Sequence, residues 1–550
     1  MSVWERGWRE ALWDELAARR APWDVIVVGG GVNGAGVFRE CVRRGLSTLL
    51  LEANDFAWGT SSRSSKLVHG GVRYLTQGQW RVTREAVRER DRLAREAPGL
   101  VEPLRFVRAL YAAERSRRWL FGVLFLTYDL FASRPTSGWV SAAEVRRRIP
   151  LAEPRGLLGG FSYLEAATDD ARIVLRLLIE GVRAGGRALS YAPVESLLSD
   201  AGVVSGVRMR DAESAGTDGG SALELRARVV VNTTGAQADT LRGTIGAGRV
   251  IRPIRGSHLL FSGARFPLAE AIAWRHPADG RNVCATPWEG STVLGTTEVE
   301  HADADPATEP RVSAAEASYL LAAANAQFPS LALAADDVIS AWAGVRPVVV
   351  GGDDSPTKAS RESMVVEERG LISVAGGKLT TFHATACEVM ARLRERFPKV
   401  RAAHGTRAFD DVPSDAADHP SLDLAERARL VGRYGQATQS LVDAARDGEL
   451  AAVPGTRTLW AELRWAARAE GVVHVDDLLL RRTRIGLLLE EGGAALLPDV
   501  RRVCQPELGW SDERWDEEAA AYRAHWRDAY AVPRGEGAAI VSRADAVTHG

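Results

Sequence analysis

Apolar and polar residues near the start of the chain follow the pattern of a strand, a helix and a second strand. Residues 24–28 form an apolar run that predicts a buried strand. Residues 32–44 then fit one helix, which Gly45 would end. Residues 47–53, STLLLEA, predict a second buried strand. Together the three segments predict a βαβ unit.

Two later segments also combine an apolar strand with a glycine turn. Residues 226–239 contain a buried strand followed by Thr-Thr-Gly. Residues 370–386 contain a strand, a Gly-Gly turn and the start of a helix. Three strands therefore end in glycine turns, and they are spread over about 360 residues.

The first of these turns has the spacing of a dinucleotide-binding loop. Gly29, Gly31 and Gly34 form GxGxxG where the strand passes into the helix, and Glu52 ends the second strand. The missing side chains let the backbone approach a pyrophosphate at the helix N-terminus, while the acid can accept ribose hydroxyls. The alternative is a glycine turn in an unrelated α/β protein, which leaves the acid and the three spaced glycines as coincidence.

The choice between NAD and FAD depends on the rest of the chain, because both use the same adenosine-pyrophosphate geometry. A nicotinamide-binding domain is usually one continuous stretch, whereas other material separates the strands here. An extended FAD bound across a discontinuous domain explains that spread better. The helix that begins near Lys378 would direct its positive end at the flavin's pyrimidine edge, which gains negative charge on reduction.

The remaining segments predict two further domains. Residues 255–263, 282–300 and 338–349 carry β-branched, strand-like runs that predict a mixed sheet. After Arg407 the pattern changes to helical periodicity, and we place a boundary near residue 405. The expected fold class is therefore α/β and α+β. It comprises a discontinuous Rossmann-type FAD-binding domain (22–100, 160–250 and 340–400), a mixed-sheet substrate-binding domain (101–159 and 251–339) and a helical C-terminal domain (405–545).

Composition excludes several classes of protein. A chain of 550 residues with net charge -1, 46% hydrophobic and 26% charged residues reads as a soluble globular protein, not a nucleic-acid binder. Cys41, Cys284, Cys387 and Cys504 form no CxxC pair or Cys/His cluster, so no disulfide framework and no metal site is expected. The N-terminus lacks the apolar core of a secretory signal. These features predict a cytoplasmic protein.

Several motifs resemble those of the FAD-dependent glycerol-3-phosphate dehydrogenases, the respiratory flavoprotein type. They are SSRSSKLVHGGVRYL, ATDDARIVL, IRGSHLLF, VLGTTEVE, WAGVRPVV and VAGGKLTTF, in the family's order. Residues 463–489 resemble the family's helical C-terminal domain. The resemblance implies oxidation of sn-glycerol 3-phosphate to dihydroxyacetone phosphate by hydride transfer to flavin N5, with electrons passed on to a quinone. It also implies peripheral attachment to the inner face of the cell membrane, and a homodimer is among the assemblies that it allows.

The resemblance assigns the FAD to a set of mostly small or polar residues. Many lie in the stretch 58–75, whose hydroxyl groups and glycines suit contact with a phosphate or a flat ring. The assigned cofactor residues are Gly29, Gly31, Asn33, Gly34, Glu52, Thr60, Ser61, Ser62, Ser65, Lys66, His69, Gly70, Gly71, Val194, Thr234, Gly235, Gly377, Lys378, Leu379 and Thr380.

A phosphate dianion held away from water requires two or more cations. The resemblance assigns Arg346 and Arg361 to this phosphate, and Arg73 and Tyr74 to the neighbourhood of substrate and flavin. Lys378 stands out because only four of the 70 basic residues are lysines. A compact ammonium there would face the flavin or the substrate oxygen.

The identity of the catalytic base stays open. His258 interrupts an apolar strand, has an ordinary pKa near 6.5 and matches a histidine that the family places near its substrate. The alternative is a structural histidine, with Lys378 or Arg346 acting on the hydroxyl. Asp169 and Asp170 precede a helical run and fit helix capping better than catalysis.

Other functions remain as alternatives. Where the family commonly has Tyr-Arg, this chain has Phe382 and His383, which allows an altered substrate. An amine or amino-acid oxidase, an enzyme that uses oxygen as acceptor, and a catalytically silent flavin-binding protein are the rival hypotheses. Residues 115–131 are basic and then apolar and are too few to span a bilayer. They fit either a membrane surface or core packing, as does the N-terminal stretch from Trp4 to Leu16.

Overall fold

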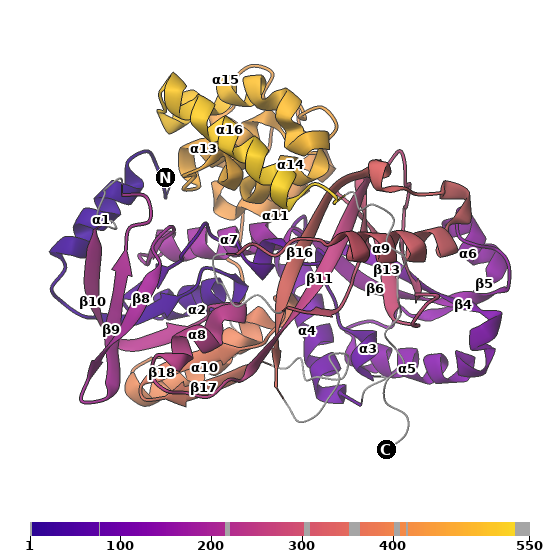
Figure 1. Ribbon diagram of the computed structural model, residues 1–550, viewed down its shortest axis with the longest axis horizontal. Coiled ribbons are helices and arrows are strands. Elements are labelled where there is room, and N and C mark those ends of the chain that lie inside the picture. Colours follow the sequence, from indigo (N-terminus) through magenta and orange to yellow (C-terminus); the bar gives the residue numbers. More distant parts are fainter. Residues whose placement is uncertain are drawn as a thin grey trace.

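Two β-sheets lie side by side, and a group of C-terminal helices packs above both of them (Figure 1). The computed structural model describes residues 3–75, 78–214, 221–301, 308–350, 363–400, 407–413 and 416–533.

The first sheet has eight strands and contains the predicted βαβ unit. Six strands lie in the order β17 (Met364–Glu368), β18 (Leu371–Ala375), β10 (Ala222–Asn232), β1 (Trp23–Val28), β2 (Thr48–Leu51) and β7 (Arg187–Leu189). All neighbours in this order are parallel except β17 and β18. The strands β8 (Val194–Asp200) and β9 (Val203–Arg210) extend β10 as an antiparallel ribbon. The helix α2 (Val32–Val42) connects β1 to β2, which confirms the βαβ prediction.

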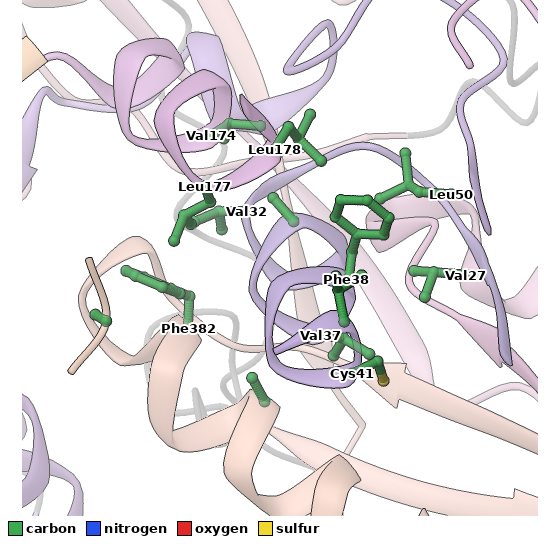
Figure 2. Close-up of a cluster of buried hydrophobic side chains, with 14 of the residues drawn as sticks. Val27, Val32, Val37, Phe38, Cys41, Leu50, Val174, Leu177, Leu178 and Phe382 are labelled. Atoms are coloured by element: carbon green, nitrogen blue, oxygen red, sulfur yellow. The ribbon is translucent and has the colours of Figure 1, made fainter. Parts of the chain in front are cut away.

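Three helices pack together against this sheet (Figure 2). They are α2, α7 (Asp170–Arg183) and α10 (Phe382–Arg396). Phe38 of α2 is fully buried, and a Cβ at Gly181 of α7 would lie 2.5 Å from its ring. Phe382 of α10 belongs to the same buried cluster. This close packing fixes α2 with its N-terminus at the carboxyl ends of the parallel strands.

The second sheet has ten strands and is mixed, as the sequence predicts. Its main order is β15 (Val299–Glu300), β11 (Ile251–Ser262), β14 (Ser291–Gly295), β13 (Asn282–Trp288), β12 (Ala271–Arg275), β4 (Val101–Tyr111), β6 (Leu157–Thr168) and β3 (Leu67–Val68). The strand β16 (Val338–Val349) pairs with β11, and β5 (Gly138–Ser141) pairs with β6. Only β12 and β4 are parallel among the described pairs.

Two boundaries expected from the sequence fall inside strands of this second sheet. Residues 160–168 belong to β6 and residues 340–349 belong to β16, although both ranges were assigned to the FAD-binding domain. Both strands lie wholly in the second sheet. Gly159 and Gly160 stand at the first of these boundaries, but they lie inside β6 and not in a turn.

The C-terminal region is helical, which completes the expected fold class. Its helices are α11 (Leu424–Tyr434), α12 (Thr438–Ala444), α13 (Trp460–Ala469), α14 (Ile485–Leu488), α15 (Leu497–Leu508) and α16 (Asp512–Ala529). Buried ion pairs join this region to α7 and to the loop after β2: Arg172 Nη1 lies 2.6 Å from Glu470 Oε1, and Arg482 pairs with Asp55. Breaking such a pair would leave a buried charge uncompensated, so these pairs enforce one docking geometry.

The N-terminal stretch packs into the core. The helix α1 (Trp8–Ala18) buries Leu12 and Leu16, and Trp4 is also buried. Its apolar spacing therefore serves core packing, which was one of the two interpretations. Among the helices that the structure describes, none has the length and hydropathy needed to cross a membrane.

Replacement of Phe38 by alanine should lower the free energy of unfolding by about 3–5 kcal/mol, because it opens a cavity between α2 and α7. Urea unfolding followed by tryptophan fluorescence measures the loss. Leu424→Ala is the control, since this leucine is 83% exposed and its removal should change the free energy by no more than about 0.5 kcal/mol. Equal losses in the two variants would contradict the packing described here.

Candidate functional site

One cavity of about 1650 Å³ lies between the carboxyl ends of the parallel strands and the second sheet. It brings together most of the residues that the sequence singles out. Those on its wall are Gly29, Gly31, Asn33, Glu52, Thr60, Ser61, Ser65, His69, Gly71, Tyr74, Val194, Thr234, Gly235, His258, Arg346, Gly377, Lys378, Leu379 and Thr380. Residues more than 300 positions apart in the sequence thus face one space.

The glycine turn after β1 forms a cradle that side chains would fill. A Cβ at Gly29, which has φ 110°, would lie 2.6 Å from the carbonyl oxygen of Thr233. A Cβ at Gly34 would overlap the carbonyl oxygen of Gly29. Gly34 itself does not line the cavity but allows α2 to press against the turn. The arrangement is the one that an extended pyrophosphate requires at a helix N-terminus.

Polar groups around the turn are arranged for a ribose and a pyrophosphate. Glu52 accepts hydrogen bonds from the backbone N–H groups of Gly30 (2.6 Å) and Asn54 (2.9 Å), and burial raises its pKa. Ser61 Oγ accepts from the N–H of Val32 at 2.9 Å, at the first turn of α2. The carboxylate retains further lone pairs for hydroxyl donors at the end of β2.

The third glycine turn joins the cradle to the opposite wall. Gly377 has φ 91°, and a Cβ there would lie 3.0 Å from Asn33 Nδ2. Asn33 Nδ2 donates to the Gly376 carbonyl at 3.3 Å. Its buried Oδ1 has no hydrogen-bond partner among the residues that the structure describes. A donor-bearing ligand such as a flavin fits this acceptor and the glycine-lined space around it.

Lys378 lies beside the ring of Tyr74, in the 69–75 segment. Its Nζ is 3.8 Å from the centroid of the Tyr74 ring, which favours the cation, and Tyr74 stacks with His69 at 6.3 Å. Thr380 Oγ1 accepts from the backbone N–H of His69 at 3.1 Å. The turn after β18 and the 69–75 segment are therefore tied together at the cavity wall.

The second sheet contributes an arginine and a histidine. Arg346 Nη2 donates to Thr296 Oγ1 at 3.0 Å, and Nη1 lies 3.5 Å from Glu298 Oε1. A Cβ at Gly256 would lie 2.6 Å from Arg346 Nη2, so glycine at this position leaves room for the guanidinium. Arg346 is thus aimed at the cavity from the strand β16.

His258 is buried, with its ring held on two sides. Its Nε2 lies 2.7 Å from Ser65 Oγ, and its ring stacks on Trp342 with centroids 5.4 Å apart. Burial, and then the charges of Arg346 and Lys66, hold the pKa of His258 well below its usual range. The imidazole is consequently neutral at neutral pH and keeps a lone pair.

A few of the expected residues lie elsewhere. Lys66, Ser62 and Gly70 are not on the cavity wall, and the ammonium of Lys66 is instead buried against Asp170 at 2.9 Å. The side chain of Arg73 and the whole of Arg361 lie outside the described residues. Successive side chains of this segment point in opposite directions, so Lys66 faces away from the cavity that its neighbour Ser65 lines.

Two sequence features have structural roles. Asp169 is the N-cap of α7 and accepts from the N–H of Arg172, which confirms the capping interpretation. His383 lies in α10, does not line the cavity, and receives a hydrogen bond on Nδ1 from Arg92 at 2.9 Å. Burial and this arginine lower the pKa of His383 to about 3. The unusual Phe382–His383 pair therefore alters helix packing and not the cavity wall.

One part of the cavity wall, which we call the aromatic arm, was not predicted from the sequence. Its walls include Phe106, Phe121 and Tyr163, and it reaches Leu120 on α5 (Arg118–Phe131). Aromatic residues at strand and helix spacing look like ordinary core, so no sequence signal marks them as cavity wall. Arg63 also lines the cavity, and it lies in the motif SSRSSKLVHGGVRYL, which is the sequence signal that could have identified it.

Comparison with known proteins gives consistent matches along the chain. A family model described as FAD dependent oxidoreductase matches residues 24–393, and one described as C-terminal domain of alpha-glycerophosphate oxidase matches residues 384–515. The chain is 32% identical to the glycerol-3-phosphate dehydrogenase of Mycobacterium leprae over 539 residues, which covers 94% of this chain and 90% of that protein.

Solved structures agree with these matches. The glycerol-3-phosphate dehydrogenase from Bacillus halodurans complexed with FAD is similar with a TM-score of 0.75 and 29% identity, covering 96% of this chain and 98% of the other. The glycine oxidase from Bacillus cereus covers 69% of this chain and 98% of the other, with a TM-score of 0.52 and 17% identity. The second likeness concerns the fold alone.

Replacement of Gly34 by alanine should yield a protein that purifies with little flavin, because the new Cβ overlaps the Gly29 carbonyl and displaces α2 from the cradle. The ratio of flavin to protein absorbance measures the effect. Gly243→Ala in α8 (Ala238–Gly243) is the control, since a Cβ there meets nothing within 4 Å. A Gly34→Ala protein with wild-type flavin content would contradict the cradle.

Proposed function

The chain belongs to the family of FAD-dependent glycerol-3-phosphate dehydrogenases, and from this membership we propose that it oxidises sn-glycerol 3-phosphate to dihydroxyacetone phosphate. FAD is the cofactor of the family. The main support for this proposal is that the glycine cradle, Arg346, Lys378 and His258 all line one cavity.

The cradle residues would hold the FAD along the carboxyl ends of the parallel strands. Glu52 would accept the ribose hydroxyls, and the turns at Gly29–Gly31 and Gly376–Gly377 would receive the pyrophosphate and the flavin. When bound, the flavin supplies an acceptor for the hydride that leaves the substrate carbon.

The cations of the cavity wall account for substrate binding. Arg346 can donate two parallel hydrogen bonds to a phosphate, and Thr296 fixes the orientation of its guanidinium. Lys378 supplies a second positive charge from the opposite wall, next to Tyr74. Two cations are what a dianion held away from water requires.

His258 is our proposed acceptor for the hydroxyl proton. Its lowered pKa keeps the ring neutral, so one of its two nitrogens carries a lone pair, and Nε2 contacts Ser65, which lines the cavity. A phosphate dianion at Arg346 would offset one of the positive charges that lower this pKa. Substrate binding would therefore raise the proton affinity of His258 when the proton is released.

An amine or amino-acid oxidase is less well supported. Such an enzyme needs one carboxylate-binding cation and an apolar amine pocket, whereas Arg63, Arg346 and Lys378 all line this cavity. The likeness to glycine oxidase covers 69% of this chain and concerns only the fold. A silent flavin-binding protein would have no need of these cations.

For the electron acceptor we propose a quinone reached from a membrane surface. The helix α5 is apolar on both sides: Phe125 and Tyr128 are buried, while Trp119, Leu126 and Leu130 are 71%, 64% and 76% exposed. Arg115 and Arg117 precede the helix, Arg118 is its first residue, and all three suit anionic lipid headgroups. The aromatic arm of the cavity reaches the same helix at Leu120, which supports an apolar route to the flavin.

Replacement of Arg346 by methionine should lower kcat/KM for sn-glycerol 3-phosphate by about 10- to 100-fold, mainly through KM, because charged hydrogen bonds to the phosphate are lost. Anaerobic stopped-flow recording of flavin absorbance measures this. Arg265→Met is the control, since Arg265 pairs with Asp337 at the far end of β11 and does not line the cavity. Identical saturation of both variants would refute the phosphate assignment, and a wild-type flavin that the substrate never bleaches would refute the proposed function.

Replacement of Trp119, Leu126 and Leu130 together by serine should weaken binding to anionic phospholipid vesicles by roughly tenfold or more, because these side chains supply the apolar contact. Co-sedimentation measures binding, and Leu424→Ser removes an equally exposed leucine from the C-terminal helices as a control. Vesicle binding that is absent in the wild type, or unchanged in the triple variant, would overturn the membrane proposal.

A further inference from the structure

The segment 62–66 separates the cavity from the C-terminal helices. Ser64 and Ser65 line the cavity, whereas Ser62 and Lys66 are buried on the other side. The backbone O of Lys66 accepts from the N–H of Thr168 at 2.9 Å. The protein itself therefore holds this segment from the side that faces away from the cavity.

A buried cluster of three charged side chains fastens the segment from behind. Asp170 accepts from Lys66 Nζ (2.9 Å), from Arg484 Nη2 (2.8 Å) and from the backbone N–H of Ser64 (2.9 Å). The carbonyl of Ser62 accepts from the same two cations, at 2.5 Å from Lys66 and 2.7 Å from Arg484. None of the three side chains is more than 1% exposed. Each cation thus bridges the segment and the first residue of α7.

Arg484 is the member of this cluster that comes from the C-terminal region. Its Nη1 also donates to the Leu480 carbonyl at 2.6 Å, so one guanidinium reaches three acceptors. A lysine has no such fork and could reach fewer of them at once. Arg484 has φ 65° and Lys66 has φ 59°, both in the left-handed region that non-glycine residues rarely occupy. The surroundings therefore hold both residues in a specific, unfavourable backbone conformation.

The fastened segment in turn holds His258. Ser65 Oγ lies 2.7 Å from His258 Nε2. The imidazole ring also stacks on Trp342, whose Nε1 donates to the carbonyl of Ser64 at 3.2 Å. Both restraints on the ring thus originate in Ser64 and Ser65, and a shift of this segment would move the histidine.

We infer that Arg484 is a positioning residue: through Asp170 and the Ser62 carbonyl it fixes Ser65, and through Ser65 it aims His258 at the substrate. This inference rests on the proposed function for the meaning of His258. It gives the C-terminal helices a part in the reaction, although they contribute no residue to the cavity among those that the structure describes.

The test compares Arg484→Met with Arg464→Met. Arg464 is a matched control because it is 2% exposed, pairs with Glu449 and Glu507, and has no described contact with the segment 62–66. Both variants should lose thermal stability. Arg484→Met alone should lower the limiting rate of anaerobic flavin reduction by about 10- to 100-fold at little change in half-saturation, as misplacement of a reacting group does. Arg484→Lys should recover part of the rate.

Two further measurements test the inference if Arg484→Met is too unstable for kinetics or if sn-glycerol 3-phosphate does not reduce the flavin. Ser65→Ala should lower the same limiting rate, and adding Arg484→Met to it should cause little further loss, because both act through one path. Nitrogen NMR of histidine-labelled protein, assigned with His258→Asn, should report a lost Nε2 hydrogen bond in Arg484→Met and an intact one in Arg464→Met.

Equal rates in the two methionine variants, additive losses with Ser65→Ala, or an unchanged His258 signal would overturn the inference. A wild-type flavin that sn-glycerol 3-phosphate does not reduce would instead overturn the proposed function. The NMR comparison would still decide the positioning role in that case, since it requires no turnover.

Discussion

The close approach of α2 to the turn after β1 is the constraint on which the cavity depends. Gly34 has no Cβ, so the first turn of α2 can rest against the Gly29 carbonyl, and Phe38 further along the helix packs against Gly181. These contacts place a helix N-terminus beside the ends of three parallel strands. The strands β11 and β16 of the second sheet, which carry His258 and Arg346, then complete the enclosure, because both face the same opening.

Charged side chains lie both on the cavity wall and behind it, and their surroundings differ. On the cavity wall, Arg346 lies 3.5 Å from Glu298 and Lys378 lies against the Tyr74 ring, and both suit an anionic ligand. Behind the wall, arginines such as Arg172 and Arg482 are fully buried but paired with carboxylates. Arginine suits this second task because its planar fork satisfies several acceptors at once and is more weakly hydrated than an ammonium. The arginine bias of the composition is consistent with this architecture.

Short-range sequence patterns predicted the glycine turns of the site. The turn around Gly29 to Gly34 and the turn before Lys378 depend on short-range patterns, and both lie where the sequence indicates. The orientation of Lys66 could not be predicted, because it depends on Asp170 and Arg484, which are 104 and 418 positions away. The aromatic arm around Phe121 was equally hidden, since burial in a core and exposure to a cavity produce the same apolar pattern. The boundary inside β6 falls at Gly159 and Gly160, a pair that is common in turns but here lies within a strand.

The long sequence separation between the segment 62–66 and Arg484 has a consequence for biosynthesis. The segment emerges early from the ribosome, whereas its anchor is made only when most of the chain exists. The strand β18 likewise joins the parallel sheet late, beside β10. The nascent chain must therefore keep its first strands and helix α2 in an incomplete state until the last third is translated. A chain that ends between β18 and Arg484 would contain all three glycine turns but not the anchor of the segment 62–66.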